Sequence, residues 1–134
     1  MPKLSKIFFR TAIVFLLVGI VMGLAMSISG RHNVTGAHAH ANLLGWVTMA
    51  IFGVYYALAP AKAETRLAMI QYGVYTLGVL IMIPSLYFLL LGNPAIEPLV
   101  ALGSLITFAG VILFAFILFT GERETTKASA SLGA

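Results

Sequence analysis

The sequence predicts an all-α protein, a bundle of four transmembrane helices, and three observations support this fold class. Hydrophobic residues make up 60% of the 134 residues, and the mean hydropathy is +1.02. Charged residues make up only 9% of the chain, whereas a soluble domain carries about 25%. Four uncharged stretches are each long enough to cross a bilayer, which takes about 20 apolar residues in a helix. We therefore expect an integral membrane protein.

The four spans are punctuated by helix-breaking residues. We expect them within a single domain of residues 1–121, at about 8–29, 38–59, 67–91 and 98–120. Pro60 closes the second span, Gly92 and Asn93 follow the third, and Pro98 opens the fourth, where a missing N–H costs little. The last residues, 122–134, are expected to form a short disordered tail.

The basic residues predict the orientation in the membrane. Seven of the eight Lys and Arg residues flank one side of the predicted bundle, namely Lys3, Lys6, Arg10, Lys62, Arg66, Arg123 and Lys127. Only Arg31 lies on the other side. The positive-inside rule then places both termini in the cytoplasm of a multi-pass protein, which we expect in a bacterial or archaeal inner (cell) membrane. Because these charges mark membrane boundaries rather than one patch, nucleic acid is not an expected partner.

Two of the three histidines, His38 and His40, open the second span. An ionisable residue at hydrocarbon depth suggests a functional site, and imidazole is a common ligand of metals and of haem iron. Residues i and i+2 of a helix point about 200° apart, so the two rings cannot share one metal if both are helical. If His38 is still extended, His32 could join them in a copper or zinc site. The simpler alternative is an interfacial pair bound to carbonyls and water. The chain has no cysteine, which excludes thiolate sites.

The segment that begins at these histidines resembles a known family. It reads His38-Ala-His40-x-x-x-Leu44-Gly45-Trp46 and continues as Phe52-Gly53-x-Tyr55-Tyr56-x-Leu58-x-Pro60. This pattern of about 23 residues resembles the tenth helix of the haem-copper oxidase catalytic subunit, in the branch of the C-type (cbb-type) oxidases and nitric oxide reductases. The whole chain also resembles short four-span proteins grouped with that subunit. The resemblance implies that His38 and His40 each bind haem iron, on opposite faces of the helix.

Other parts of the family pattern are missing. The copper site of that family needs histidines from further helices, and none occurs in the first, third or fourth span. The spans also lack the buried carboxylates or lysines that a proton pump uses as relays. We therefore do not expect oxygen reduction coupled to proton pumping from this chain alone.

The resemblance also implies an assembly. The family's subunit contains three four-helix arcs, and its haem ligands come largely from the second helix of each arc. This chain has the length of one arc, so we expect a homo-oligomer, as a trimer, with haem b between His40 of one copy and His38 of the next. The alternatives are a dimer that uses His40 twice, and ligation by Met26. Such a protein would transfer electrons or bind a diatomic gas.

Several residues could support a haem. Arg31 is a candidate partner of the propionates, Asn42 or a loop carbonyl could hold the free imidazole N–H, and Trp46 could wall the porphyrin or simply pack. Two further patterns indicate helix packing and interhelical hydrogen bonds, and they are Gly19-x-x-x-Gly23 and the group Gln71, Tyr72, Tyr75 and Thr76. The alternative functions are a copper- or zinc-binding protein and a structural or assembly subunit of a membrane complex.

Overall fold

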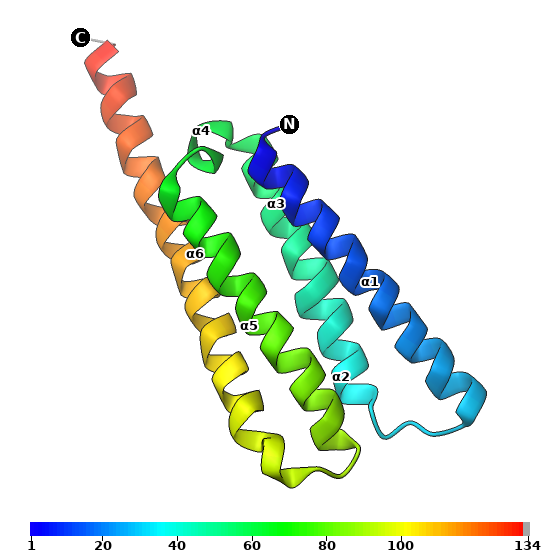
Figure 1. Ribbon diagram of the computed structural model, residues 1–134. Coiled ribbons are helices and arrows are strands. Elements are labelled where there is room, and N and C mark those ends of the chain that lie inside the picture. The colour runs from blue at the N-terminus through cyan, green and yellow to red at the C-terminus, as the bar shows by residue number, and fades with distance from the viewer. Residues whose placement is uncertain (133–134) are drawn as a thin grey trace.

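Four long helices run side by side in the computed structural model, which describes residues 1–132, with side chains for residues 1–120 (Figure 1). The elements in chain order are α1 (Lys3–Ser29), α2 (Thr35–His40), η1 (Ala41–Thr48), α3 (Met49–Leu58), α4 (Pro60–Ala63), α5 (Arg66–Leu90), η2 (Pro94–Ile96) and α6 (Glu97–Leu132). The described residues contain no strand. The prediction of an all-α four-helix bundle is therefore confirmed.

The four helices are long and apolar enough to cross a membrane. The candidate spans are Lys3–Ser29, Thr35–Leu58, Arg66–Leu90 and Pro94–Thr120. The second span consists of α2, η1 and α3 in succession and is the least apolar of the four. Its helix begins at Thr35, so the histidines lie one turn inside it rather than at its first residue. The N-terminus, α4 and the C-terminal end of α6 lie at the same end of the bundle (Figure 1).

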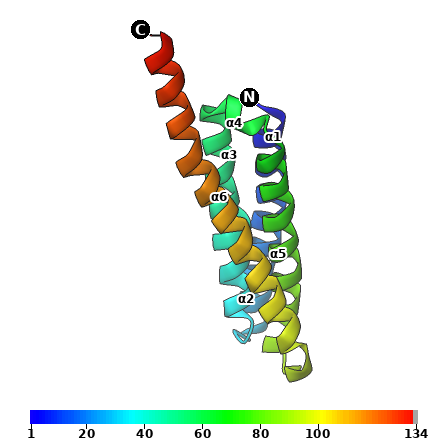
Figure 2. The same ribbon diagram turned by 90° about the vertical axis from the view of Figure 1, so that its left-hand side faces the viewer.

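The backbone of α6 differs from the sequence-based expectation at its C-terminal end. The helix continues to Leu132 through the segment expected to be disordered, 122–134, of which residues 133–134 lie outside the described part. Figure 2 shows α6 extending past the other helices. Residues 122–132 contain no proline or glycine and are rich in good helix formers such as Ala, Glu, Lys and Arg, which permits the helix to continue.

The bundle consists of two helical hairpins, and the second, α5 with α6, is packed backbone against backbone. A Cβ added to Gly103 would lie 2.6 Å from the backbone nitrogen of Met82, and one added to Gly110 would lie 2.7 Å from Cα of Tyr75. Small residues allow such close approach, which is how helices associate in lipid without a hydrophobic driving force. The glycines of α6 thus set the spacing of this hairpin.

Aromatic rings join the two hairpins in the half of the bundle nearer the termini. Phe8 of α1 meets Tyr72 of α5 edge to face at 4.9 Å between ring centroids. Phe52 of α3 lies 4.3 Å from Phe114 of α6 and 5.0 Å from Tyr75 of α5. Edge-to-face and tilted pairs of this kind are the favourable arrangements of aromatic rings.

Polar side chains reinforce this junction. Tyr56 donates to Oε1 of Gln71 at 3.2 Å, and Nε2 of Gln71 donates to the Gly110 carbonyl at 3.3 Å. The hydroxyls of Thr11 and Tyr72 share a hydrogen bond of 2.7 Å between α1 and α5. Gln71, Tyr72 and Tyr75 of the third span therefore form interhelical hydrogen bonds, as predicted, whereas Oγ1 of Thr76 is buried without a partner. These bonds satisfy groups that lipid would leave without partners.

Candidate functional site

His38 and His40 both lie in α2, and their rings make different contacts. Nδ1 of His38 lies 2.7 Å from the carbonyl oxygen of Gly19 in α1. Nδ1 of His40 lies 2.7 Å from the carbonyl oxygen of Gly36, one turn earlier in its own helix. The helical state of both residues confirms the premise of the 200° argument. His38 is therefore not in an extended segment, because α2 already begins at Thr35.

The third histidine, His32, does not join His38 and His40 in a cluster. His32 lies in the exposed connection before α2. Within the described residues, no group of three or more His, Cys, Asp or Glu side chains could hold a metal ion. His32, His38 and His40 of one copy are therefore not brought together in this conformation.

Two glycines of α1 form the recess that receives His38. A Cβ added to Gly23 would lie 2.9 Å from Cε1 of the His38 ring, and one added to Gly19 would overlap Oδ1 of Asn42. The Gly19-x-x-x-Gly23 pattern therefore does serve packing, as predicted. Its partners are the polar side chains of the second span rather than a bare helix surface, and no local sequence signal identifies them.

The hydrogen bonds around His38 define its tautomer. A carbonyl oxygen only accepts, so the bond to Gly19 requires the proton on Nδ1 of His38. In the neutral ring, Nε2 is then an acceptor, and the side-chain nitrogen of Asn42 lies 3.4 Å from it. Oδ1 of Asn42 is buried without a hydrogen-bond partner. The backbone of α1, rather than Asn42 or a loop carbonyl, thus holds the imidazole N–H.

His40 repeats this arrangement on the surface. Its Nδ1 donates to the Gly36 carbonyl, and its side chain is exposed. Ligating histidines usually donate the second ring nitrogen to a carbonyl or carboxylate, which fixes the tautomer and raises the basicity of the ligating atom. Both histidines therefore have Nδ1 occupied and Nε2 in the form that binds a metal.

A π-helix, η1, begins directly after His40. It spans Ala41–Thr48 and places Gly45 against Phe15 of α1. Carbonyl groups of η1 accept extra bonds, from Thr48 Oγ1 to Leu43 at 2.8 Å and from Tyr75 OH to Leu44 at 2.8 Å. π-Helical segments are rare and often occur at functional sites. Sequence reasoning did not find this element, because its amino-acid pattern is that of an ordinary apolar helix.

The remaining candidate residues are placed apart from the histidine rings. Trp46 lies in η1, half-buried against the hydrophobic core, which favours packing. Arg31 and Met26 line a cavity of about 380 Å³ between α1 and α5 that neither His38 nor His40 lines. Met26 is only 7% exposed, and its sulfur accepts from Thr35 Oγ1 at 3.7 Å. That burial makes Met26 a packing residue in this conformation.

In each copy, the ring of the exposed His40 could supply one axial ligand to a haem iron. His40 offers an exposed neutral Nε2, whereas the His38 ring is half-buried between α2 and α1. Residues i and i+2 of a helix point about 200° apart, so His38 and His40 of one copy do not offer imidazoles to both faces of one porphyrin.

Comparison of the chain with protein-family models, with curated proteins and with solved structures finds no match.

Proposed function

We propose that the chain is an integral membrane haem b protein in which His40 supplies an axial ligand and a second copy completes the site. The observation that carries the proposal is the shared geometry of the two histidines. Each donates Nδ1–H to a backbone carbonyl over 2.7 Å, and each leaves Nε2 as the ligating atom. This is the arrangement of metal-ligating histidines.

Two pairings between copies are consistent with this geometry. In the trimer implied by the resemblance, His40 of one copy and His38 of the next are the ligands, and a cyclic assembly repeats one heterologous interface. That pairing requires Nε2 of His38 to exchange its contact with Asn42 for iron. A two-fold dimer that pairs His40 with His40 leaves the recess on α1 undisturbed. The exposure of His40 supports its role in both assemblies.

The number of imidazole ligands sets the function. A bound haem supplies one-electron redox chemistry, and the protein's part is to choose its axial ligands and surroundings. Two imidazoles fill both axial positions, which suits electron transfer. A single imidazole leaves one position for a diatomic gas. Arg31 lies at the same end of the bundle as the histidines, and it is the proposed cation for the propionates.

Optical spectra of the purified full-length chain test this proposal. We expect a Soret band and sharp α and β bands after reduction. His40→Ala should abolish the Soret, α and β bands in either assembly, the trimer or the dimer. His38→Ala should abolish them in the trimer and spare them in the dimer, so this variant separates the two pairings.

His32→Ala is the matched variant in the connection before α2, and it should retain the spectrum. A normal helical circular-dichroism spectrum of each variant shows that loss of haem is not loss of fold. Haem retained by His40→Ala, or a colourless protein that carries copper or zinc, would overturn the proposal. The second outcome would favour the metal-binding alternative.

Carbon monoxide separates the two haem functions. A reduced protein with two imidazoles should show no spectral change on addition of carbon monoxide, whereas a protein with one imidazole should shift its Soret band.

A further inference from the structure

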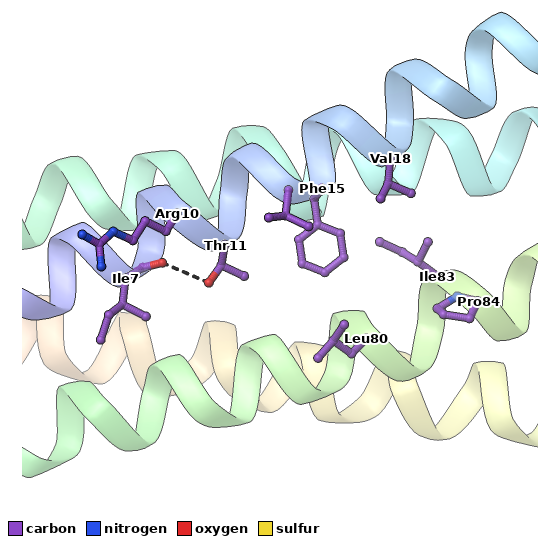
Figure 3. Close-up of a pocket in the computed structure, with 9 residues that line it drawn as sticks. Ile7, Arg10, Thr11, Phe15, Val18, Leu80, Ile83 and Pro84 are labelled. Atoms are coloured by element: carbon purple, nitrogen blue, oxygen red, sulfur yellow. Dashed lines mark hydrogen bonds between the residues drawn. The ribbon is translucent and has the colours of Figure 1, made fainter.

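A crevice of about 450 Å³ lies between α1 and α5, on a different face of α1 from the His38 recess. Figure 3 shows Val18 and Phe15 of α1 facing Leu80, Ile83 and Pro84 of α5 across it. Its volume falls in the range of about 300–1,000 Å³ that is typical of ligand sites. The walls are hydrocarbon over most of their length, so the occupant must be apolar over most of its length too.

One charged side chain, Arg10, lines this crevice. It lies seven residues after the first residue of α1, Lys3, which is about 10 Å along the helix. Neither Glu64 nor Glu97, the two acidic residues with described side chains, lines the crevice. A guanidinium at the margin of the hydrocarbon needs an anionic partner or a path to water.

The other polar group at this end of the crevice is already satisfied. The hydroxyl of Thr11 donates to the Ile7 carbonyl at 2.9 Å (Figure 3). It also shares a hydrogen bond of 2.7 Å with the hydroxyl of Tyr72. Thr11 therefore has little capacity left for a ligand. Arg10 is the group at this position that can bind one.

Two more cations share the face of α1 that carries Arg10. Lys3, Lys6 and Arg10 follow the i, i+3, i+7 spacing of one helix face, and all three are exposed. Clusters of Lys and Arg beside a span attract anionic lipids, and guanidinium matches the oxygens of a phosphate group in a bidentate pair. The charge at the mouth of the crevice thus complements a lipid with a net negative charge.

We propose that the crevice is a binding site for one anionic phospholipid from the leaflet on the side of the termini. An acyl chain lies between α1 and α5, and the phosphate group pairs with Arg10. The residues of α1 that line the crevice run from Ile7 to Val18, which is about 16 Å of helix. This site does not depend on the proposed haem, because neither histidine lines it.

Native mass spectrometry tests the proposal after reconstitution of the full chain into vesicles of equal parts phosphatidylglycerol and phosphatidylcholine. The wild-type chain should retain phosphatidylglycerol in preference to phosphatidylcholine after extraction into detergent. Arg10→Gln should lower the retained phosphatidylglycerol about fivefold, the effect of one juxtamembrane cation. Arg66→Gln, the matched loss of an exposed arginine that does not line the crevice, should change it little.

A second pair of variants tests the crevice itself. Val14→Phe fills it, whereas Ile13→Phe adds the same ring next to it on an exposed position that does not line it. Val14→Phe should lose the retained lipid and Ile13→Phe should keep it. If Val14→Phe lowers the melting temperature strongly, Val18→Phe with Ile20→Phe as its control gives the same comparison.

Two results would overturn the proposal. One is equal retention of lipid by Val14→Phe and Ile13→Phe, which would mean that the crevice holds no chain. The other is equal retention of the two lipids by the wild-type chain, which would mean that Arg10 selects no charge. Inorganic phosphate at the same concentration should not displace the lipid, since it cannot occupy the apolar part.

Discussion

At the scale of single residues, two glycines of α1 determine what the histidine motif can do. Gly23 leaves room for the His38 ring, and Gly19 leaves room for the Asn42 amide while its carbonyl accepts the imidazole N–H. The tautomer of His38 thus depends on a residue 19 positions earlier in the chain. A side chain at either glycine would displace a polar group into lipid or against the backbone.

Gly19→Ala should therefore destabilise the fold. The added Cβ would overlap Asn42 Oδ1, and overpacking of this kind costs about 1–3 kcal/mol. Gly73→Ala is the matched control in α5, because an added Cβ there meets nothing within 4 Å. Thermal unfolding followed by circular dichroism in detergent measures both. A melting temperature of Gly19→Ala equal to that of Gly73→Ala would show that the recess is not tight.

At the scale of elements, the second span is a composite of α2, η1 and α3. The π-helix follows the histidines directly in the chain. Within it, the carbonyl of Leu44 accepts a hydrogen bond from a side chain of the other hairpin. Tyr75 reaches it from α5 over 2.8 Å. This bond connects the segment that carries the histidines to the second hairpin.

Tyr75→Phe should weaken that connection without creating a cavity. Interhelical hydrogen bonds in membranes contribute about 0.6 kcal/mol on average and up to about 1.7, so a loss in that range is expected. Hydrogen exchange of the η1 amides should increase more than that of α6. The control is Tyr87→Phe, which removes a hydroxyl from a half-buried ring near the other end of α5. Unchanged exchange in η1 would contradict a role of Tyr75 in holding the π-helix.

At the scale of the whole molecule, the two hairpins are joined unevenly. Aromatic rings and hydrogen bonds tie them together in the half nearer the termini. A crevice of about 450 Å³ between α1 and α5 begins beside this junction, and a cavity of about 380 Å³ lies between them near the opposite end. The open side of the bundle therefore lies between α1 and α5. An arginine lines each of the two cavities, Arg10 in one and Arg31 in the other.

The predicted orientation can be tested on this architecture, because the chain has no cysteine of its own. Glu64→Cys lies at the end of the bundle that holds the termini, and Asn93→Cys lies at the opposite end. In sealed cells, a membrane-impermeant maleimide should label Asn93→Cys and leave Glu64→Cys unlabelled. After permeabilisation both should react. The reverse pattern would contradict the positive-inside orientation.

The sequence by itself determined the class of the protein, its four spans and the position of both histidines near the start of the second span. These follow from local properties: long uncharged runs need lipid, and a 3.6-residue repeat separates residues i and i+2. The continuation of α6 and the π-helix escaped prediction, because apolar and helix-forming residues permit them without requiring them.

Only the tertiary structure decided what each candidate residue meets. It placed His38 in a recess of α1 and left His40 on the surface. It also placed Met26 and Arg31 at the cavity of about 380 Å³, which neither histidine lines. These outcomes depend on pairs such as Gly19 with His38 and Leu44 with Tyr75, which are 19 and 31 residues apart. Contacts across such separations are set by how helices pack, and no local pattern encodes them.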